Sequence, residues 1–248
     1  MSIKVNIQSL TIKNKVILNN INFECANNTI TTIIGRNGSG KSTLVNVLAS
    51  NIKYDGKIYI DNNDINKLNS KDKAKLISFV FQNINTPHIK VNELVSFGRT
   101  PYTDINNKLS ENDVNIINKA ISCSNINDIE NCYLDQISGG EIKKAYFAMM
   151  LAQNTNNVVL DEVTSSMDKD NERNFLSLIR KITNEENKCT ICVMHNIDNA
   201  IRFSDNILLL DNGKQIFYGK TEDLLKTNLI EQYLKIEKFV IDNEIFYK

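Results

Sequence analysis

The sequence lacks tryptophan and has little proline and glycine: of its 248 residues none is Trp, two are Pro and nine are Gly. No apolar run approaches the ~20 residues that a membrane-spanning helix needs, so we expect no such segment. The first ten residues, MSIKVNIQSL, alternate apolar and polar residues and lack the apolar block of a signal peptide. We therefore expect a cytosolic chain whose role at a membrane, if it has one, comes through a partner.

An excess of charge of either sign is also missing, since Lys+Arg and Asp+Glu both total 29. A neutral chain has no global field that would attract a polyanion, which argues against coating of DNA or RNA. Apolar residues make up 42% and charged residues 23%, as in a soluble globular protein. The length is enough for one large domain, or two small ones, with a buried core.

The five cysteines are an odd number, which in a cytosolic chain argues for free thiols. Cys189 and Cys192 form a CxxC pair, a spacing that also occurs in metal and redox sites. However, the surrounding run KCTICVMH is apolar and β-branched, which predicts a buried strand. Residues three apart on a strand point to opposite faces, so this pair could not chelate one ion there. We interpret both cysteines as structural.

Alternation of strand and helix patterns at both ends, with helical sequence between them, predicts an α/β fold. Its parallel core should carry a helical subdomain. The predicted elements are strands at Ile3–Ile7, Val16–Cys25, Thr29–Ile34, Lys57–Asp61 and Ser78–Phe81, mostly helical sequence from about Asn92 to Gln153, a strand at Val158–Asp161, a helix at Lys169–Ile182, a strand at Thr190–Met194, a hairpin at Asn206–Tyr218 turning at Asp211-Asn212-Gly213, and a tail hairpin turning near Asp242-Asn243.

A glycine-rich segment between a predicted strand and a predicted helix matches G-x-x-x-x-G-K-[ST]. Its glycines let backbone N–H groups turn inward around phosphate oxygens, and the helix adds its positive N-terminal end. Lys41 should bridge the β- and γ-phosphates, and the Ser42 hydroxyl should hold Mg²⁺. A ligand-free strand–helix turn would not need all four fixed positions. The predicted phosphate loop consists of Gly35, Arg36, Asn37, Gly38, Ser39, Gly40, Lys41, Ser42 and Thr43.

Two carboxylates, Asp161 and Glu162, end the apolar run VVL. Asp161 should point toward the Mg²⁺ shell, and Glu162 should orient or deprotonate the attacking water. Any strand can end in two acidic residues, so the pattern alone is weak. Together with the phosphate loop, however, it supplies the metal ligand and the base that triphosphate hydrolysis needs.

A second candidate anion site is the segment Ser138-Gly139-Gly140-Glu141, which precedes the helical run IKKAYFAMMLAQN. Taken alone, the segment is better interpreted as an ordinary helix N-cap. One nucleotide does not need two phosphate cradles from the same chain. A two-fold dimer uses both, because the cradle of each chain then closes on the nucleotide of the other.

With these residues in place, the sequence resembles the ATP-binding cassette family of transporter ATPases over nearly its whole length. The segments GRNGSGKST, ISGGE (LSGGQ is usual in the family) and VVLDE occur in the family's order. The resemblance implies a P-loop NTPase fold with a parallel-sheet core, an N-terminal antiparallel β subdomain and an inserted α-helical subdomain. The expected layout is one domain, 1–248, with its core at about 1–85 and 155–220, a helical subdomain at about 86–154 and a C-terminal extension from about 221.

The resemblance also implies roles for three further residues. Gln82 in FVFQN matches a glutamine that touches Mg²⁺ and the attacking water, and Asp168 in SSMD matches an aspartate at the dimer seam. His195 in VMHN matches a histidine that contacts the γ-phosphate, where a neutral imidazole can donate to developing charge. The implied cofactors are ATP and Mg²⁺. The implied sites are catalytic Gln82, Glu162 and His195, metal ligands Ser42, Gln82 and Asp161, and, for the second nucleotide, Ser138, Gly139, Gly140, Glu141 and Asp168.

Several positions depart from the family pattern. Val163 stands where the family usually has Pro, and Met167 where it has Leu. Glu141 replaces the usual Gln and places a negative charge near a phosphate site, where it should tune closure. The aromatic residue that usually stacks on adenine should fall near Ile12. Losing that stack should weaken nucleotide binding by about 1–3 kcal/mol.

The stretch VNELVSFGRTPYTD, from Val91 to Asp104, and the later LDQISGGEIKKAYFAMMLAQNT look like importer ATPases for iron–siderophore chelates, and more loosely like those for haem and cobalamin. In that family the first stretch forms a groove for the membrane subunit. Groove or hinge residues would then be Phe97, Arg99, Pro101 and Tyr102. The alternative is a generic helix–loop.

The implied assembly is a peripheral one at the cytoplasmic face of the membrane. It would contain a second ATPase subunit, integral membrane permease subunits and, indirectly, an extracytoplasmic substrate-binding protein, without nucleic acid. A soluble cassette ATPase of iron–sulfur assembly or translation, or a non-catalytic nucleotide-binding regulator, are the competing functions. Translation factors that resemble this family usually carry two cassettes, whereas each motif occurs once in this chain. A non-catalytic regulator is disfavoured because the chain retains Glu162 and His195.

Overall fold

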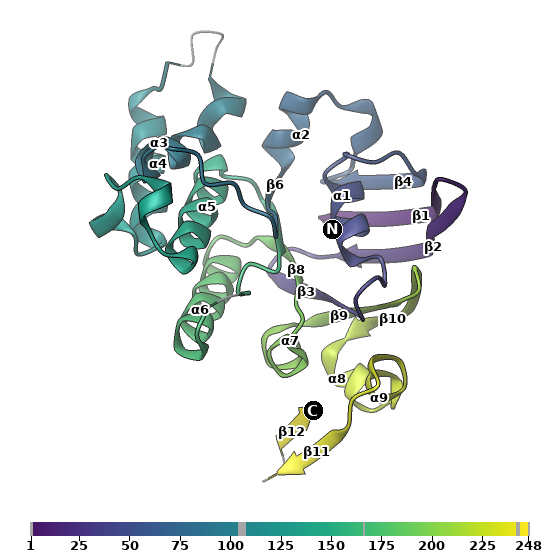
Figure 1. The fold of residues 1–248 in the computed structure, drawn as a ribbon. Helices are drawn as coiled ribbons and strands as arrows, with labels where there is room; N and C mark the ends of the chain where they lie inside the picture. The colour runs from purple at the N-terminus through teal and green to yellow at the C-terminus, as the bar shows by residue number, and fades with distance from the viewer. Residues whose placement is uncertain (1, 104–107, 166, 242–243, 248) are drawn as a thin grey trace. The chain divides into compact units, whose positions relative to one another are not determined.

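The computed structural model describes residues 2–103, 108–165, 167–241 and 244–247. The chain separates into two compact units, which we call unit 1 (residues 1–67 and 183–248) and unit 2 (residues 68–182). Figure 1 shows the elements of both. The predicted helical subdomain, 86–154, lies within unit 2. The exact subdomain boundaries stay a prediction.

The antiparallel part of unit 1 consists of β1 (Ile3–Ile12), β2 (Lys15–Cys25), β4 (Asp55–Ile60) and β5 (Asn63–Asp64). In β1, apolar residues at alternate positions are buried and the polar residues between them are exposed, because side chains alternate across a strand. This confirms the predicted antiparallel pair. The first strand is longer than predicted and runs on to a two-residue turn at Lys13 and Asn14, whose φ angles are 47° and 62°.

The parallel part of unit 1 centres on β3 (Thr29–Ile34), which pairs with β8 (Cys189–Val193) on one side and β9 (Asn206–Asp211) on the other. β10 (Lys214–Lys220) returns antiparallel to β9. The strand order in unit 1 is β5-β4-β1-β2-β10-β9-β3-β8 (Figure 1). Cys189 and Cys192 both lie buried in β8, as the apolar run predicted, and all five cysteines are free thiols.

The helices of unit 1 are short. They are α1 (Lys41–Leu48), the 3-10 turn η1 (Ile65–Lys67), α7 (Ile197–Phe203), α8 (Thr221–Leu225) and α9 (Leu229–Leu234). The last three were not predicted, since helices of two turns or fewer show little periodicity. The tail strands β11 (Lys238–Ile241) and β12 (Glu244–Tyr247) confirm the second hairpin. Its predicted turn, at Asp242 and Asn243, falls outside the described residues.

Unit 2 contains the parallel pair β6 (Ile77–Val80) and β7 (Asn157–Asp161). α2 (Ser70–Leu76), which was not predicted, precedes β6, and most of α6 (Lys169–Glu185) also belongs to this unit. Ser78 and Thr155 join their hydroxyls at 2.8 Å, and Thr155 also donates to the carbonyl of Asn157. The buried polar groups next to this strand pair are therefore satisfied.

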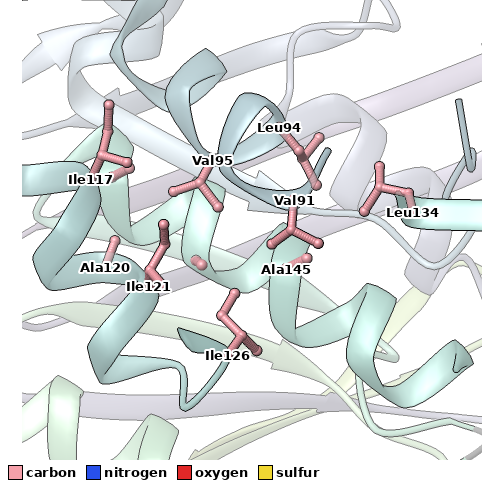
Figure 2. Packing of buried hydrophobic residues seen from close by; sticks show 11 residues of the cluster. Val91, Leu94, Val95, Ile117, Ala120, Ile121, Ile126, Leu134 and Ala145 are labelled. Atoms are coloured by element: carbon pink, nitrogen blue, oxygen red, sulfur yellow. The ribbon is translucent and has the colours of Figure 1, made fainter. Parts of the chain in front are cut away.

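The rest of unit 2 is helical, as the sequence predicted. It comprises α3 (Val91–Ser96), η2 (Phe97–Tyr102), α4 (Glu111–Cys123), η3 (Asn127–Ile129), η4 (Leu134–Gln136) and α5 (Gly139–Gln153). Figure 2 shows aliphatic side chains of α3 and α4 gathered beside Ala145 of α5. The small alanines of α4 and α5 leave room for these helices to pack closely. The buried cluster consists of Val91, Leu94, Val95, Ile117, Ala120, Ile121, Ile126, Leu134, Ala145, Ala148 and Ala152.

Left-handed backbone positions are filled largely by asparagine in this glycine-poor chain. Of the thirteen described non-glycine residues with positive φ, eight are Asn. Asparagine tolerates this conformation because its short polar side chain can bond to the local backbone. Glu162, with a φ of 52°, is an exception that lies at the predicted catalytic position. In the described part of the chain, no helix could cross a membrane.

Candidate functional site

The phosphate loop connects β3 to α1 and is closely packed. A Cβ atom on Gly35 would lie 2.4 Å from the Leu210 carbonyl oxygen and 2.5 Å from Ser39 Oγ. Gly40 is the N-cap of α1 with a φ of 104°, and a Cβ there would lie 2.7 Å from Leu18 Cδ2. Gly35 is therefore required for steric reasons, because its neighbour is a backbone carbonyl, and Gly40 is required mainly by its left-handed backbone.

The polar groups of this loop fit a phosphate ligand. The Lys41 ammonium donates to the carbonyl oxygens of Gly35 at 2.7 Å and Arg36 at 3.2 Å, so it lies inside the loop. Ser39 Oγ is buried and, among the described residues, makes no hydrogen bond. A buried donor of this kind is costly unless a ligand accepts from it. The loop thus matches a polyanion rich in acceptor oxygens.

A cavity of about 570 Å³ adjoins the loop within unit 1. His195 faces it, so the structure brings this histidine to the phosphate loop, as expected from the sequence. The remaining lining residues include two from the β9–β10 turn and two from the C-terminal segment, which the sequence did not suggest. The lining consists of Gly35, Arg36, Asn37, Ser39, His195, Ile197, Asp211, Asn212, Leu234 and Ile236.

His195 is held between a strand end and a helix start. Just before it, Met194 N donates to the Ile33 carbonyl at 3.4 Å, which keeps the chain beside the end of β3. Just after it, Asn196 caps α7 by accepting from the Asn199 backbone N–H at 3.0 Å. The histidine itself is exposed. Its place at the rim of the cavity is therefore fixed by the backbone on both sides.

The C-terminal hairpin packs on α7, the helix that follows His195. Tyr247 N donates to Asp198 Oδ1 at 2.9 Å, and the Arg202 guanidinium lies 5.0 Å from the centre of the Phe246 ring. Burial raises the pKa of Tyr247 to about 12, with smaller contributions from the charges of Glu231 and Asp198. The extension therefore supports the helix that begins just after His195.

In unit 2, the structure brings Gln82 to Glu162. Gln82 Nε2 donates to Glu162 Oε2, and Glu162 is 7% exposed. Asp161 ends β7 and is 4% exposed. The carboxylate of Asp161, the amide oxygen of Gln82 and, in unit 1, the hydroxyl of Ser42 are hard oxygen donors of the type that Mg²⁺ prefers.

A lysine that sequence reasoning missed also contacts this turn. The Lys143 ammonium donates to the Glu162 carbonyl at 3.3 Å, to Ser165 Oγ at 2.6 Å and to the Ser165 carbonyl. Burial lowers the pKa of Lys143, while the charge of Glu162 acts in the opposite sense. No motif marks this residue, because its partners lie about twenty positions later and meet it only through folding.

The second candidate anion site lies at the N-terminus of α5. Ser138 caps the helix, and Glu141 folds back so that its Oε2 accepts from the Ser138 N–H at 2.8 Å and from the Ser138 hydroxyl at 2.7 Å. These bonds lower the pKa of Glu141. A Cβ atom added to Gly139 would have no neighbour within 4 Å. A Cβ atom added to Gly140 would have one, Met167 Cγ, at 4.0 Å. Space for a ligand at this turn therefore remains within the chain.

Asp168 lies at the start of α6 and is exposed. Its carboxylate accepts from the backbone N–H of Asn171 at 2.8 Å and from the Asn171 side chain at 2.6 Å. Both bonds lower the pKa of Asp168, so it stays ionised. The described structure gives it a helix-capping role, which does not conflict with a role at a dimer seam.

Of the expected groove residues, Phe97 is 54% and Tyr102 37% exposed, but Arg99 is 4% exposed. Arg99 Nε forms an ion pair with Asp113 at 2.8 Å, and its NH1 group donates to the Ala152 carbonyl at 2.9 Å. Of the two expected roles, that of lining a surface groove is wrong for Arg99, and that of a hinge residue stays a prediction. Arg99 joins η2 to α4 and α5. Asp104, the last residue of that stretch, lies outside the described residues.

Comparison with known proteins identifies the family. The model of the family described as ABC transporter matches residues 18–165. The chain is 36% identical over 234 residues to the petrobactin import ATP-binding protein YclP of Bacillus subtilis (strain 168), covering 93% of this chain and 92% of that protein. It is 30% identical to the ferric enterobactin transport ATP-binding protein FepC of Escherichia coli (strain K12), covering 91% of this chain and 84% of FepC.

A solved structure supports the same assignment and the predicted P-loop NTPase fold. It is the dimeric post-hydrolysis state of the ATP-binding cassette MJ0796 bound to ADP and Pi, with a TM-score of 0.77 and 26% identity. The match covers 89% of this chain and 99% of the other. The chain belongs to the ABC transporter family, and within it to the ATP-hydrolysing ABC ATPases.

Proposed function

We propose that this chain is the ATPase subunit of an importer for iron chelates of the siderophore class. The observation that carries the ATPase part is the loop cradle: the Lys41 ammonium lies inside the loop, and Ser39, whose hydroxyl makes no hydrogen bond among the described residues, lines the same cavity as His195. The importer part rests on the relatives. One is a petrobactin import ATP-binding protein at 36% identity, and the other is a ferric enterobactin transport ATP-binding protein at 30% identity. Their different cargoes support a class of cargo and no single siderophore.

In this proposal, backbone N–H groups of Gly35 to Thr43 bind the triphosphate, and Lys41 leaves the loop carbonyls to bridge the β- and γ-phosphates. Ser42, Asp161 and Gln82 would hold Mg²⁺. When bound, the metal ion supplies positive charge against the charge of the phosphate oxygens. Arg36 and Asn37 border the cavity and would contact the nucleotide from the side.

Three side chains carry the hydrolysis. The Glu162 carboxylate accepts a proton from the attacking water, and the amide of Gln82 orients that carboxylate through the bond seen here. His195 donates a hydrogen bond to the γ-phosphate, where negative charge develops. Because Glu162 and Gln82 are already in contact, this pair needs little rearrangement before reaction.

Two copies of the chain would form the working unit. The open turn at Ser138, Gly139, Gly140 and Glu141, together with Asp168, would contact the nucleotide that the partner's phosphate loop holds. A two-fold dimer makes this contact twice. The dimeric MJ0796 structure, at 26% identity and with ADP and Pi bound, supports this arrangement.

The dimer would act at the cytoplasmic face of the membrane, attached to integral permease subunits. An extracytoplasmic binding protein would reach it indirectly through them. The exposed Phe97 and Tyr102, on η2, are the proposed contact with the permease, because large exposed apolar side chains mark interaction surfaces. The cargo would never touch this chain, so no iron ligands are required of it.

The test is co-purification with candidate permease subunits, followed by ATPase assays of the assembled complex in lipid. Binding protein loaded with a ferric catecholate or hydroxamate should stimulate hydrolysis, and Glu162→Gln should remove the stimulated rate. Stimulation by haem or cobalamin alone would refute the siderophore assignment. Association with sulfur-mobilising proteins in place of a permease would refute the importer.

A further inference from the structure

Lys143 connects two segments of unit 2 that the proposed function treats separately. It lies on α5, shortly after the Ser138 turn that begins this helix, and it is only 9% exposed. Its ammonium ends in the turn that follows β7, where it has three oxygen partners on Glu162 and Ser165. A buried ammonium is costly without hydrogen-bond acceptors, so these three oxygens fix the position of the Lys143 ammonium.

The turn that Lys143 contacts has an unfavourable backbone. Glu162 has a φ of 52°, a left-handed conformation that residues with a long side chain rarely adopt. Such strain persists only where the surroundings hold it. Ser165 N closes the turn by donating to the Glu162 carbonyl at 3.1 Å, and Lys143 donates to the same oxygen at 3.3 Å.

The same conformation sets the direction of the Glu162 side chain. From this backbone, the carboxylate reaches the Gln82 amide, while the carbonyl of the same residue faces Lys143. A change at the carbonyl therefore changes where the carboxylate points. Small displacements of a reacting group are costly, because rate depends steeply on orientation.

We propose that Lys143 is a positioning residue for ATP hydrolysis: it fixes the Glu162–Ser165 turn to α5 and thereby holds the Glu162 carboxylate in its reactive direction. This inference rests on the proposed role of Glu162. It also gives a physical connection, within one chain, from the Ser138 turn to the catalytic carboxylate. Movement of α5 when the Ser138 turn binds phosphate would be passed to Glu162 through this ammonium.

The first experiment compares Lys143→Met, which keeps the apolar stem and removes the charge, with the wild type. We expect kcat to fall about 100-fold, because the Glu162 carboxylate is no longer held in its reactive direction. The KM for ATP should change less than about twofold, because the hydrogen bonds described for Lys143 go to Glu162 and Ser165 and not to the phosphate loop. Lys181→Met, at an exposed position of α6, is the matched control and should leave both constants unchanged. A proportional rise in KM, or an unchanged kcat, would overturn the proposal.

If Lys143→Met does not fold, Ser165→Ala tests the same contact by removing the hydroxyl at 2.6 Å. It should lower kcat several-fold while the melting temperature stays within about 2 °C of the wild type. A full kcat in a folded Ser165→Ala protein, together with failure of Lys143→Met to fold, would mean that Lys143 serves the fold alone.

The decisive experiment is a double-mutant cycle on single-turnover rates. If Lys143 acts through Glu162, adding Lys143→Met to Glu162→Gln should not lower the residual rate further. An equal fold-loss in both backgrounds would overturn the positioning role. Wild-type hydrolysis by Glu162→Gln alone would instead overturn the proposed base, and that result is visible without any change at Lys143.

Discussion

Glu141 Oε2 accepts hydrogen bonds from both the backbone N–H and the hydroxyl of Ser138, at 2.8 Å and 2.7 Å. Ser138 belongs to the turn that we propose contacts the partner's nucleotide, and the side of this turn at Gly139 and Gly140 is open. The two donors of Ser138, however, are already used by the Glu141 carboxylate within one chain. A phosphate that accepts from Ser138 has to displace this carboxylate from the helix end, and that displacement costs free energy.

We expect Glu141→Gln to strengthen ATP-dependent dimerisation about fivefold, because about 1 kcal/mol of interaction between the carboxylate and the helix terminus is lost. The same change should lower the melting temperature slightly. Analytical ultracentrifugation with ATP measures the fraction of dimer in two proteins, Glu162→Gln alone and Glu162→Gln combined with Glu141→Gln. Glu111→Gln, in the first turn of α4, is the control. Weaker dimerisation in Glu141→Gln would show that the carboxylate aids closure.

Lys41→Ala should abolish nucleotide-dependent activity, with a loss of at least about 100-fold in kcat/KM, as for removal of a preorganised charge at a phosphoryl group. Calorimetric titration with ATP and a steady-state assay measure the effect. Lys57→Ala, at an exposed position of β4, should behave as wild type. Unchanged turnover in Lys41→Ala would remove this lysine from the site.

Ile12 and Val16 are 39% and 54% exposed on the β1–β2 hairpin, and neither offers an aromatic surface to a base. Ile12→Tyr should tighten ATP binding by about 1–3 kcal/mol, or roughly 5- to 150-fold, if the adenine lies against this hairpin. Inorganic tripolyphosphate, which has no base, should bind equally to both proteins. Equal ATP affinity in the two proteins would show that the base lies elsewhere.

Asp113 should make folding sensitive to acid. Hydrogen bonds from Ser110 and from Arg99 lower its pKa from 3.8 to about 2. Because the pKa is lower in the folded state, the carboxylate stabilises the fold above pH ~4, and this contribution is lost as the pH falls toward 2. Asp113→Asn should therefore unfold more readily than wild type at pH 7, and the difference should shrink below pH 4. A constant difference in denaturant melts across this range would refute the linkage.

Much of the architecture could be predicted because it depends on short, local patterns in the sequence. Apolar alternation marked β1, and the run TITTII marked the buried β3. The Asp211-Asn212-Gly213 turn has positive φ at Asn212 (45°) and Gly213 (75°), as its composition predicted. The motif residues of the loop could be named for the same reason, since their chemistry depends on close sequence spacing.

What could not be predicted depends on contacts between distant residues. Nothing near Arg99 in the sequence shows that it is buried against Asp113, so its groove role was expected wrongly. Likewise, the sequence gives no reason to distinguish Lys143 from other charged residues of a helix, because its contacts with the turn after β7 form only on folding. Glu141 is a different case. Ser138-x-x-Glu141 is a capping-box pattern, which could have shown that the carboxylate folds back.

The Asn212-Gly213 turn has a chemical consequence for the purified protein. Asparagine followed by glycine is the dipeptide most prone to lose its side-chain amide, since the small neighbour lets the next backbone nitrogen attack the amide carbon. Asn37-Gly38 repeats it, and both asparagines line the cavity beside Lys41's loop. Each event would add a negative charge to the cavity beside the loop that we propose binds the triphosphate. Stored samples should thus lose nucleotide affinity with age while their circular dichroism spectrum stays the same.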